Sequence, residues 1–284
     1  MLVELAVGDA YGAGFEYARP DFVARFNDRT RYIKHPRHGI APGAYTDDTQ
    51  MSIAICEVML AAEGWTRGLL AERFVQAFKR DPREGYAQRF YHFLHEVSDG
   101  ADFLDKIIPT SDKSGAAMRA APIGLFNTVD EVRHKCELQA RITHDTTSGV
   151  NAALAAALMT HYCYHDLGPK AGLGRFIERH VPGNWSDRFA GKVGSKGWMS
   201  VKAAITALSE STGMCALLRR CIAFTGDVDT VASIALAAGS VSRELKQDLP
   251  QQLIEGLERG PYGLEYLRSL DAKLIATFPR RSVG

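Results

Sequence analysis

Apolar residues recur with helical spacing along most of this 284-residue chain. Residues 51–62 place apolar side chains at i, i+4, i+7, i+8 and i+11, which is one face of a helix. Residues 148–164 are apolar on nearly every side and rich in alanine, which predicts a central, buried helix that its neighbours can approach closely. Similar patterns predict helices over 68–79, 86–97, 201–208, 214–224, 231–245, 249–257 and 263–278.

No segment shows the alternation of apolar and polar residues that is typical of a strand, and no fixed-period repeat is visible. The pattern therefore predicts an all-α fold. Two long polar segments, 20–44 and 182–197, contain the prolines and glycines typical of loops, and long loops in a compact domain often have a function. Because no shift in composition marks a boundary, we expect residues 1–284 to form a single domain.

Charge and cysteine content argue against several classes of protein. The chain has 34 basic and 33 acidic residues, so its net charge of +1 favours neither nucleic acid nor a membrane surface as a partner. The five cysteines form no CxxC pair and lie mostly in apolar stretches, which indicates reduced thiols in the core. The first residues lack the basic region of a signal peptide, and no apolar run reaches the roughly 18 residues of a membrane span. We therefore expect a cytoplasmic protein.

Two short acidic clusters, far apart in the chain, carry the strongest chemical signal. They are Thr46-Asp47-Asp48-Thr49 and Asp227-Val228-Asp229-Thr230, and each directly precedes an apolar, helix-like stretch. Neighbouring carboxylates repel one another, so folding them together requires a compensating charge, and a hard divalent cation with oxygen ligands is the best match. We predict one oxygen-lined metal site, with room for two ions, on two helix N-termini.

A simpler explanation accounts for either cluster taken alone. Aspartate and threonine before a helix are ordinary N-caps, and acidic residues in a first turn suit the helix dipole. Two clusters of matching composition favour the metal site. A calcium-binding EF-hand is excluded, because neither segment has the required acidic positions, the central glycine and the final glutamate.

The first residues contain a glycine-rich segment, Gly8–Glu16. Gly8 and Gly12 have the spacing of small residues on one helical face, and a tightly packed first helix explains them as well as a ligand does. Glu16 lies where this helix should end. It is a candidate acid, base or metal ligand, and an exposed carboxylate is the alternative.

Three further features are candidates for binding. The segment Ser111–Arg119 has hydroxyl groups and a glycine before a helix-like stretch, and free backbone N–H groups at such a position bind phosphate. A plain capped loop explains the segment equally well. It matches neither a P-loop nor a dinucleotide-binding fingerprint. His144 precedes the central helix, where a histidine is more often a structural donor than a catalyst. Trp198 follows the second long loop and is able to stack on a ring, although tryptophans usually pack.

Five segments, in this order, resemble the ADP-ribosylglycohydrolase family of dinitrogenase-reductase-activating glycohydrolases and ADP-ribosyl-acceptor hydrolases: GDAYGAGFE, YTDDTQM, SGAAMRAAPIGL, ITHDTTSGVNAALAAAL and FTGDVDTVASIALAAGS. They extend from Gly8 to Ser240, which is most of the chain. The resemblance implies a compact, orthogonal multi-helix bundle with a binuclear site for two divalent cations, Mg²⁺ or Mn²⁺.

The resemblance also implies roles for individual residues. Glu16 and Asp48 would act in catalysis. The residues implied as metal ligands are Thr46, Asp47, Asp48, Asp227, Asp229 and Thr230, and those implied to bind the substrate are Ser111, Ser114, Gly115, His144 and, more loosely, Trp198.

The implied activity is hydrolysis of the glycosidic bond between ADP-ribose and an acceptor, such as an arginine or serine side chain of a modified protein, with release of ADP-ribose. The expected partner is thus an ADP-ribosylated protein or another ADP-ribose conjugate. Three positions depart from the family pattern: Thr225 and Val228 in the second cluster, and Ser114, where an asparagine is usual. Serine and aspartate at positions 111 and 112 leave the acceptor open. The alternatives are a hydrolase of a different ADP-ribose conjugate and an inactive ADP-ribose-binding relative, and the intact carboxylates favour the hydrolase.

Overall fold

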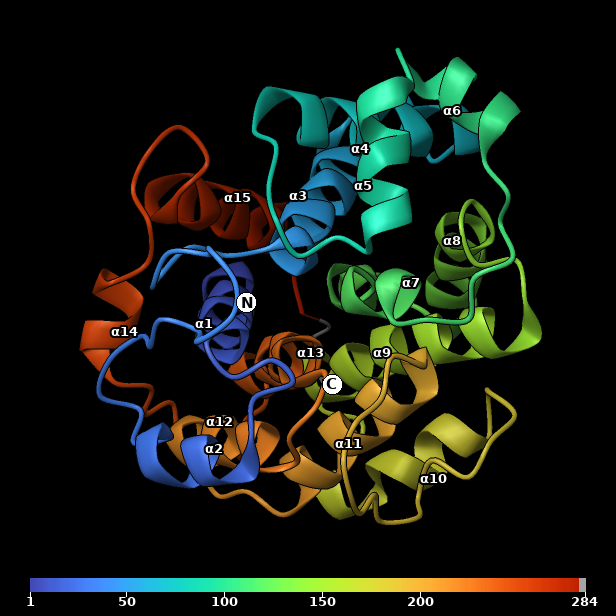
Figure 1. The fold of residues 1–284 in the computed structure, drawn as a ribbon. Helices are drawn as coiled ribbons and strands as arrows, with labels where there is room; N and C mark the ends of the chain where they lie inside the picture. The colour runs from blue at the N-terminus through green and yellow to red at the C-terminus, as the bar shows by residue number, and fades with distance from the viewer. Residues whose placement is uncertain (281–284) are drawn as a thin grey trace.

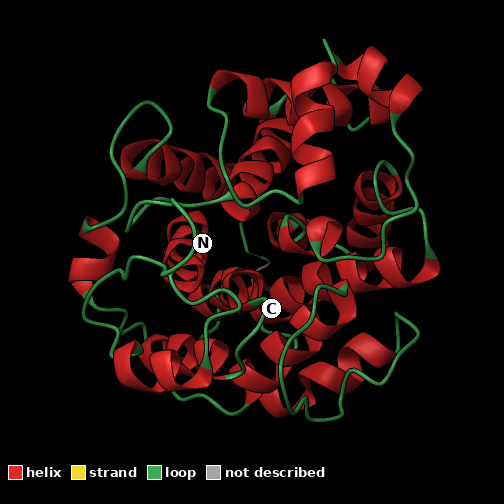
Figure 2. Ribbon diagram, in the orientation of Figure 1, coloured by secondary structure: helices red, strands yellow, loops and turns green. Residues whose placement is uncertain are grey.

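The structure is a computed structural model, and it describes residues 1–280. Within these residues the chain is helical, with no strand and only isolated bridges between single residues (Figure 2). The helices are α1 (Leu2–Ala13), α2 (Pro20–Phe26), α3 (Asp47–Leu60), α4 (Arg67–Arg80), α5 (Gln88–Glu96), α6 (Gly100–Lys106), α7 (Gly115–Met118), α8 (Val129–Arg141), α9 (Thr147–Tyr164), α10 (Leu173–Glu178), α11 (Gly197–Ser209), α12 (Met214–Ala223), α13 (Val228–Ser240), α14 (Gln251–Glu255) and α15 (Leu264–Thr277), with short 3₁₀ helices η1 (Ala121–Leu125) and η2 (Lys170–Gly172). The all-α prediction is confirmed.

Helices α1, α13 and α9 form the centre of the molecule, and the other helices surround them at many angles (Figure 1). Helix α9 is buried along nearly its whole length, as its alanine-rich sequence predicts. Helices α1 and α13 pack backbone against backbone, because a Cβ at Gly8 would lie 2.6 Å from the Ala232 carbonyl and one at Gly12 would lie 2.3 Å from the Asp229 Cα. These two glycines therefore bring the end of α1 against the start of α13.

Several predicted boundaries are wrong, and helices α6, α8 and α10 lie where the sequence pattern predicted none. Residues 20–44 are not all loop, because α2 begins with Pro20 at its first position and places Phe22 and Phe26 one turn apart, with ring centroids separated by 4.7 Å. The helix predicted to reach residue 245 ends at Ser240. Leu245 is buried from the loop that follows, so its apolar character extended the predicted pattern. Residues 249–257 form only the short helix α14, which Pro250 precedes.

The cysteines lie as the sequence predicts. All five cysteines are free thiols, four of them buried, as predicted. Among residues 1–280, no helix combines the length and the apolar character needed to cross a membrane.

A carboxylate-lined cavity as the candidate active site

One cavity of about 580 Å³ brings together most of the residues predicted to form the site. The predicted residues on its wall are Glu16, Asp47, Asp48, Ser111, Ser114, Gly115, His144, Asp227, Asp229 and Thr230. They come from the end of α1, the starts of α3 and α13, the loop before α7 and the turn before α9. Segments more than two hundred residues apart in the sequence therefore meet at one place.

Glu16 is held at the cavity by the turn that follows α1. The next residue, Tyr17, has a φ of 48°, and its backbone N–H donates to the carbonyl of Gly226 at 2.8 Å. This hydrogen bond ties the end of α1 to the loop that precedes α13. Glu16 thereby comes to lie with Asp227 and Asp229, and oxygen atoms of the three carboxylates are within 4.8 Å of one another.

The start of α13 depends on a glycine. Gly226 has a φ of 93°, and a Cβ there would lie 1.8 Å from the carbonyl oxygen of Val193. Only glycine fits this close approach, which allows the backbone N–H of Asp227 to donate to the same Val193 carbonyl. Hydroxyl groups of Ser200 and Thr230 then donate to the Asp227 carboxylate, each at 3.2 Å.

The start of α3 is capped by a residue of another helix. Asp9 of α1 is fully buried and accepts four hydrogen bonds, from the backbone N–H and the hydroxyl group of both Thr46 and Thr49, over 2.6–3.0 Å. Thr46, although buried and outside the cavity wall, donates its hydroxyl proton to Asp9, so its oxygen lone pairs remain available to a cation. Asp9 therefore sets where Asp47 and Asp48 lie.

Replacing Asp9 with asparagine should destabilise the protein by about 2–3 kcal/mol, since an amide NH₂ would face donors that now point at a carboxylate. Denaturant unfolding of Asp9→Asn beside the wild type, both in magnesium, measures this change. Repulsion works against this loss of stability, because the charge of Asp9 raises the pKa values of its neighbours Glu16, Asp47 and Asp48. A variant as stable as the wild type would show that this repulsion outweighs the four hydrogen bonds.

The carboxylates have no positive partner within the described residues. No lysine, arginine or histidine of residues 1–280 forms an ion pair with Glu16 or with any aspartate of the two clusters. Asp229 Oδ1 is sealed from solvent and has no hydrogen-bond donor. Asp48 Oδ2 has one hydrogen-bonding neighbour, the Ser233 hydroxyl group, at 3.1 Å. Unpaired, buried oxygens of this kind fit hard divalent cations, which prefer carboxylate and hydroxyl ligands.

Burial and mutual repulsion raise the pKa values of the whole cluster. Burial, and then the charges of Asp227 and Asp9, raise the pKa of Glu16 to about 7. Burial and neighbouring carboxylates raise the pKa values of Asp47, Asp48 and Asp229 well above the ordinary range of an aspartate. The cluster is thus unfavourable at neutral pH unless a cation compensates its charge.

We expect the metal-free protein to lose stability as the pH rises. A group whose pKa is higher in the folded than in the unfolded state stabilises the fold below its unfolded pKa, and this contribution disappears as the pH passes the folded value. For Glu16 alone the loss between pH 5 and pH 8 should be about 2 kcal/mol. Thermal unfolding of metal-free protein across this range should show a falling midpoint, and magnesium should raise the midpoint more at pH 8 than at pH 6. A midpoint that rises with pH without metal would contradict the buried cluster.

The rest of the cavity has a different character. Its wall contains the rings of Phe90 and Phe93 and the side chains of Ile107 and Ile108, together with the basic Arg89 and Lys106. The loop that carries Ser111, Ser114 and Gly115 lines the same cavity. The cavity thus combines a cluster of carboxylates with apolar and basic side chains.

Pairings with two distant segments hold this loop in place. Thr110 pairs with His144 and Lys113 pairs with Lys196 through isolated backbone bridges, and the Thr146 hydroxyl donates to the Ser111 carbonyl at 3.0 Å. Beside the loop, Lys196 also forms an ion pair with Asp112. The loop is therefore fixed against the turns that precede α9 and α11.

Trp198 is not brought to this cavity. It is 42% exposed and lies in a separate hollow of about 260 Å³, with Asn151, Asn184 and Trp185 among the residues around it. Its predicted contact with the substrate therefore has no support from its position.

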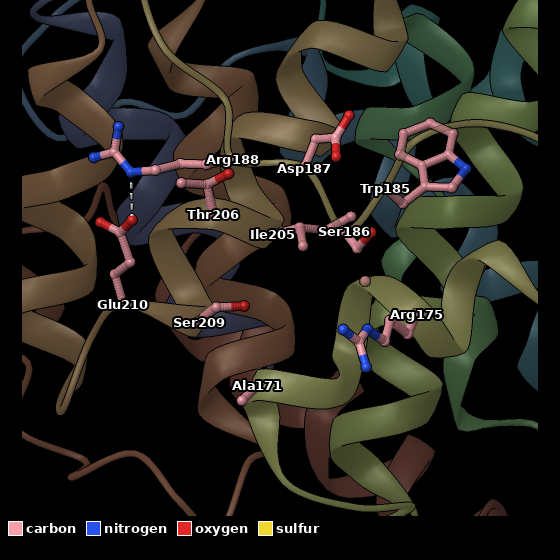
Figure 3. A pocket seen from close by; sticks show the side chains of 11 residues that line it. Ala171, Arg175, Trp185, Ser186, Asp187, Arg188, Ile205, Thr206, Ser209 and Glu210 are labelled. Carbon is pink, nitrogen blue, oxygen red and sulfur yellow. Dashed lines mark hydrogen bonds and ion pairs between the residues drawn. The ribbon is translucent and has the colours of Figure 1, made fainter.

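Another hollow, of about 340 Å³, lies between α10 and α11 (Figure 3). Both of its acidic side chains have basic partners: Glu210 accepts a hydrogen bond from Arg188 at 2.6 Å and is paired with Arg220, and Asp187 is paired with Lys202 at 3.6 Å. Its carboxylates thus differ from the unpaired carboxylates of the main cavity.

Sequence reasoning did not identify several residues around the site. Asp9 is a charged residue in an otherwise apolar stretch of α1, a position where a buried charge usually has a partner or a function, so a signal was present. Arg119, Thr143 and Ser233 gave no such signal. They matter only because the fold buries their side chains beside the cavity.

Comparison with known proteins agrees with this geometry. The model of the family described as ADP-ribosylglycohydrolase matches residues 1–282. The human ADP-ribosylhydrolase ARH3 is 33% identical over 128 residues, 41% of this chain, and the match spans about a third of its length, 34%. The ADP-ribosyl-[dinitrogen reductase] glycohydrolase of Rhodospirillum rubrum is 28% identical over 189 residues, 62% of each chain.

A solved structure has the same fold. It is described as an ADP-ribosylglycohydrolase-related protein complex, and it superposes with a TM-score of 0.74 over 97% of this chain and 95% of its own, at 21% identity. The expected type of helical bundle is therefore confirmed. Because the family match extends over nearly the whole chain, the protein belongs to the ADP-ribosylglycohydrolase family.

Proposed function

We propose that this protein is a metal-dependent hydrolase that cleaves the glycosidic bond between ADP-ribose and an acceptor such as a modified protein side chain. One observation carries the proposal: five carboxylates without a positive partner line a cavity of about 580 Å³, which is within the usual size range for small-molecule sites. Family membership supplies the class of substrate.

Two divalent cations, Mg²⁺ or Mn²⁺, are the proposed cofactors. Their proposed ligands are Thr46, Asp47, Asp48, Asp227, Asp229 and Thr230. The unpartnered Asp229 Oδ1 supports this assignment, since an anionic oxygen sealed in the protein interior needs a positive neighbour. When bound, such cations would neutralise the cluster and lower the pKa of water.

Glu16 is the proposed general base, and Asp48 is the alternative. Glycosidic bonds break through a transition state with oxocarbenium character, so a base is needed to take a proton from the attacking water. Without cations the pKa of Glu16 is about 7, and nearby positive charge would lower it, which leaves the carboxylate free to accept that proton at neutral pH.

The ADP-ribose would lie along the rest of the cavity. Ser111, Ser114, Gly115 and His144 are proposed to contact it, because they line the same cavity as the carboxylates. The pyrophosphate is proposed to lie on the backbone N–H groups near Ser114 and Gly115.

The test is release of free ADP-ribose from arginine-linked and from serine-linked ADP-ribosylated protein, with magnesium, with manganese and without metal. Release from one substrate that requires metal would support the hydrolase and identify the acceptor. Equal release without metal would contradict the cation site. No release from either substrate, with ADP-ribose still bound, would point to a different conjugate or to a binding role.

A further inference from the structure

Arg119 is a buried cation on the wall of the active-site cavity. Its side chain is 1% exposed, and no carboxylate of residues 1–280 pairs with it. Its Nε donates to Gln139 Oε1 at 2.7 Å, and its Nη2 donates to the Gln139 carbonyl at 3.1 Å and to Thr143 Oγ1 at 2.9 Å. The guanidinium carbon also lies 4.4 Å from the ring centre of Phe74. These contacts hold the guanidinium in a fixed orientation.

The direction of the next hydrogen bond follows from this arrangement. A guanidinium has only donors, so Thr143 Oγ1 must accept from Arg119. The hydroxyl proton of Thr143 is then directed to His144 Nδ1, which lies 2.7 Å away and is the one acceptor that the described residues offer to this hydroxyl. His144 Nδ1 therefore accepts, and the ring proton resides on Nε2.

The other protonation states of His144 fit the contacts less well. A proton on Nδ1 would place two donors on the Thr143 oxygen and leave its own hydroxyl proton without an acceptor. The doubly protonated ring is also disfavoured, because burial and the charge of Arg119 lower the pKa of His144 to about 3. Asp112, the acidic neighbour that opposes this change, is already paired with Lys196.

We propose that Arg119 and Thr143 are positioning residues that fix His144 as the Nε2–H tautomer, so that His144 donates a hydrogen bond to the substrate. The Cε1–Nε2 edge of the ring lies against Gly115, at 3.0 and 3.2 Å from where a Cβ of that residue would be. Nε2 forms no hydrogen bond within residues 1–280, and His144 lines the cavity. Its acceptor would be a phosphate or ribose oxygen. That last step rests on the proposed function, whereas the tautomer does not.

NMR of ¹⁵N-labelled protein in magnesium tests the tautomer directly. His144→Gln identifies the signals of His144 among those of the nine histidines. We expect the Nδ1 of His144 in the unprotonated range and the Nε2 in the protonated range, unchanged between pH 6 and pH 8. A proton on Nδ1, or a ring that takes up a second proton in this range, would overturn the proposal.

Two variants test the positioning role. Thr143→Val removes the hydroxyl and should give a mixture of tautomers with roughly five- to tenfold weaker binding of ADP-ribose, while Thr143→Ser keeps the hydroxyl and should match the wild type in both measurements. A single Nε2–H tautomer in Thr143→Val would refute the role of Thr143. If no ADP-ribosylated substrate is cleaved but the wild-type ring is Nε2–H, the proposed function fails and this assignment stands.

Discussion

Asp229→Asn should lose at least about a thousandfold in turnover and also the thermal stabilisation by magnesium, while the protein keeps its helical content. Asp229 lies in the first turn of α13, is buried, and contributes an oxygen that no donor in the described structure contacts. The amide is uncharged and a poorer ligand, so the affinity for the cations should fall. Metal-free Asp229→Asn should be at least as stable as the wild type at pH 8, because the substitution removes one of several repelling charges.

The matched control is Asp130→Asn. Asp130 also lies in the first turn of a helix, α8, but its side chain is exposed and outside the cavity. This control should keep wild-type turnover and the full magnesium effect. The decisive measurements are ADP-ribose release and the unfolding midpoint, each with and without magnesium. Asp229→Asn with wild-type turnover at limiting metal would rule out the binuclear site.

The sequence was sufficient to predict the parts of the site that depend on local pattern. Asp47 and Asp48 are adjacent, and Asp227 and Asp229 are separated by one residue, so their repulsion is visible without a structure. Periodicity placed each pair before a helix, and the structure does begin α3 and α13 there. The sequence does not show that the starts of α3 and α13 meet in the fold.

Other parts of the site depend on contacts between distant segments. Asp9 contacts Thr46 across 37 positions of sequence, and Arg119 contacts Thr143 across 24, so no local pattern shows either pairing.

The position of Trp198 also depends on contacts that the sequence does not show. Trp198 follows Lys196, which pairs with Lys113 of the loop that carries Ser111 and Ser114, but α11 begins at Gly197 and the ring lies in a different hollow. Proximity in sequence therefore did not give proximity to the cavity.

The cluster also explains why one buried site combines two properties. Burial and mutual repulsion raise the pKa values of the carboxylates, so their ionised forms are unfavourable together unless a cation compensates their charge. The same burial places Glu16 near the pKa at which a carboxylate can take up and release a proton around neutral pH. The proposed metal binding and the proposed proton transfer would thus have a common physical origin in the burial of these carboxylates.

General base and metal ligand are the two roles proposed for Glu16, and Glu16→Gln distinguishes them. Its carboxylate lies within the 4.8 Å group that includes Asp227 and Asp229, so a metal ligand is the alternative to a general base. If Glu16 is the base, Glu16→Gln should lose about a hundred- to a thousandfold in turnover and retain the magnesium-induced rise in the unfolding midpoint. If Glu16 is an essential metal ligand, the variant should lose both turnover and the magnesium-induced rise. In metal-free protein at pH 8 the variant should also be more stable than the wild type, because it removes a carboxylate whose pKa is about 7.

Glu63→Gln is the control for this substitution. Glu63 stands three residues after the end of α3, as Glu16 stands three residues after the end of α1, but its side chain is exposed and outside the cavity. Its turnover and its magnesium effect should both equal those of the wild type. Should Glu16→Gln retain full turnover, Asp48 would become the candidate base, because it is the other carboxylate proposed for that role and its pKa is also raised. The rate of ADP-ribose release between pH 5 and pH 9 would then still depend on an ionisation in Glu16→Gln.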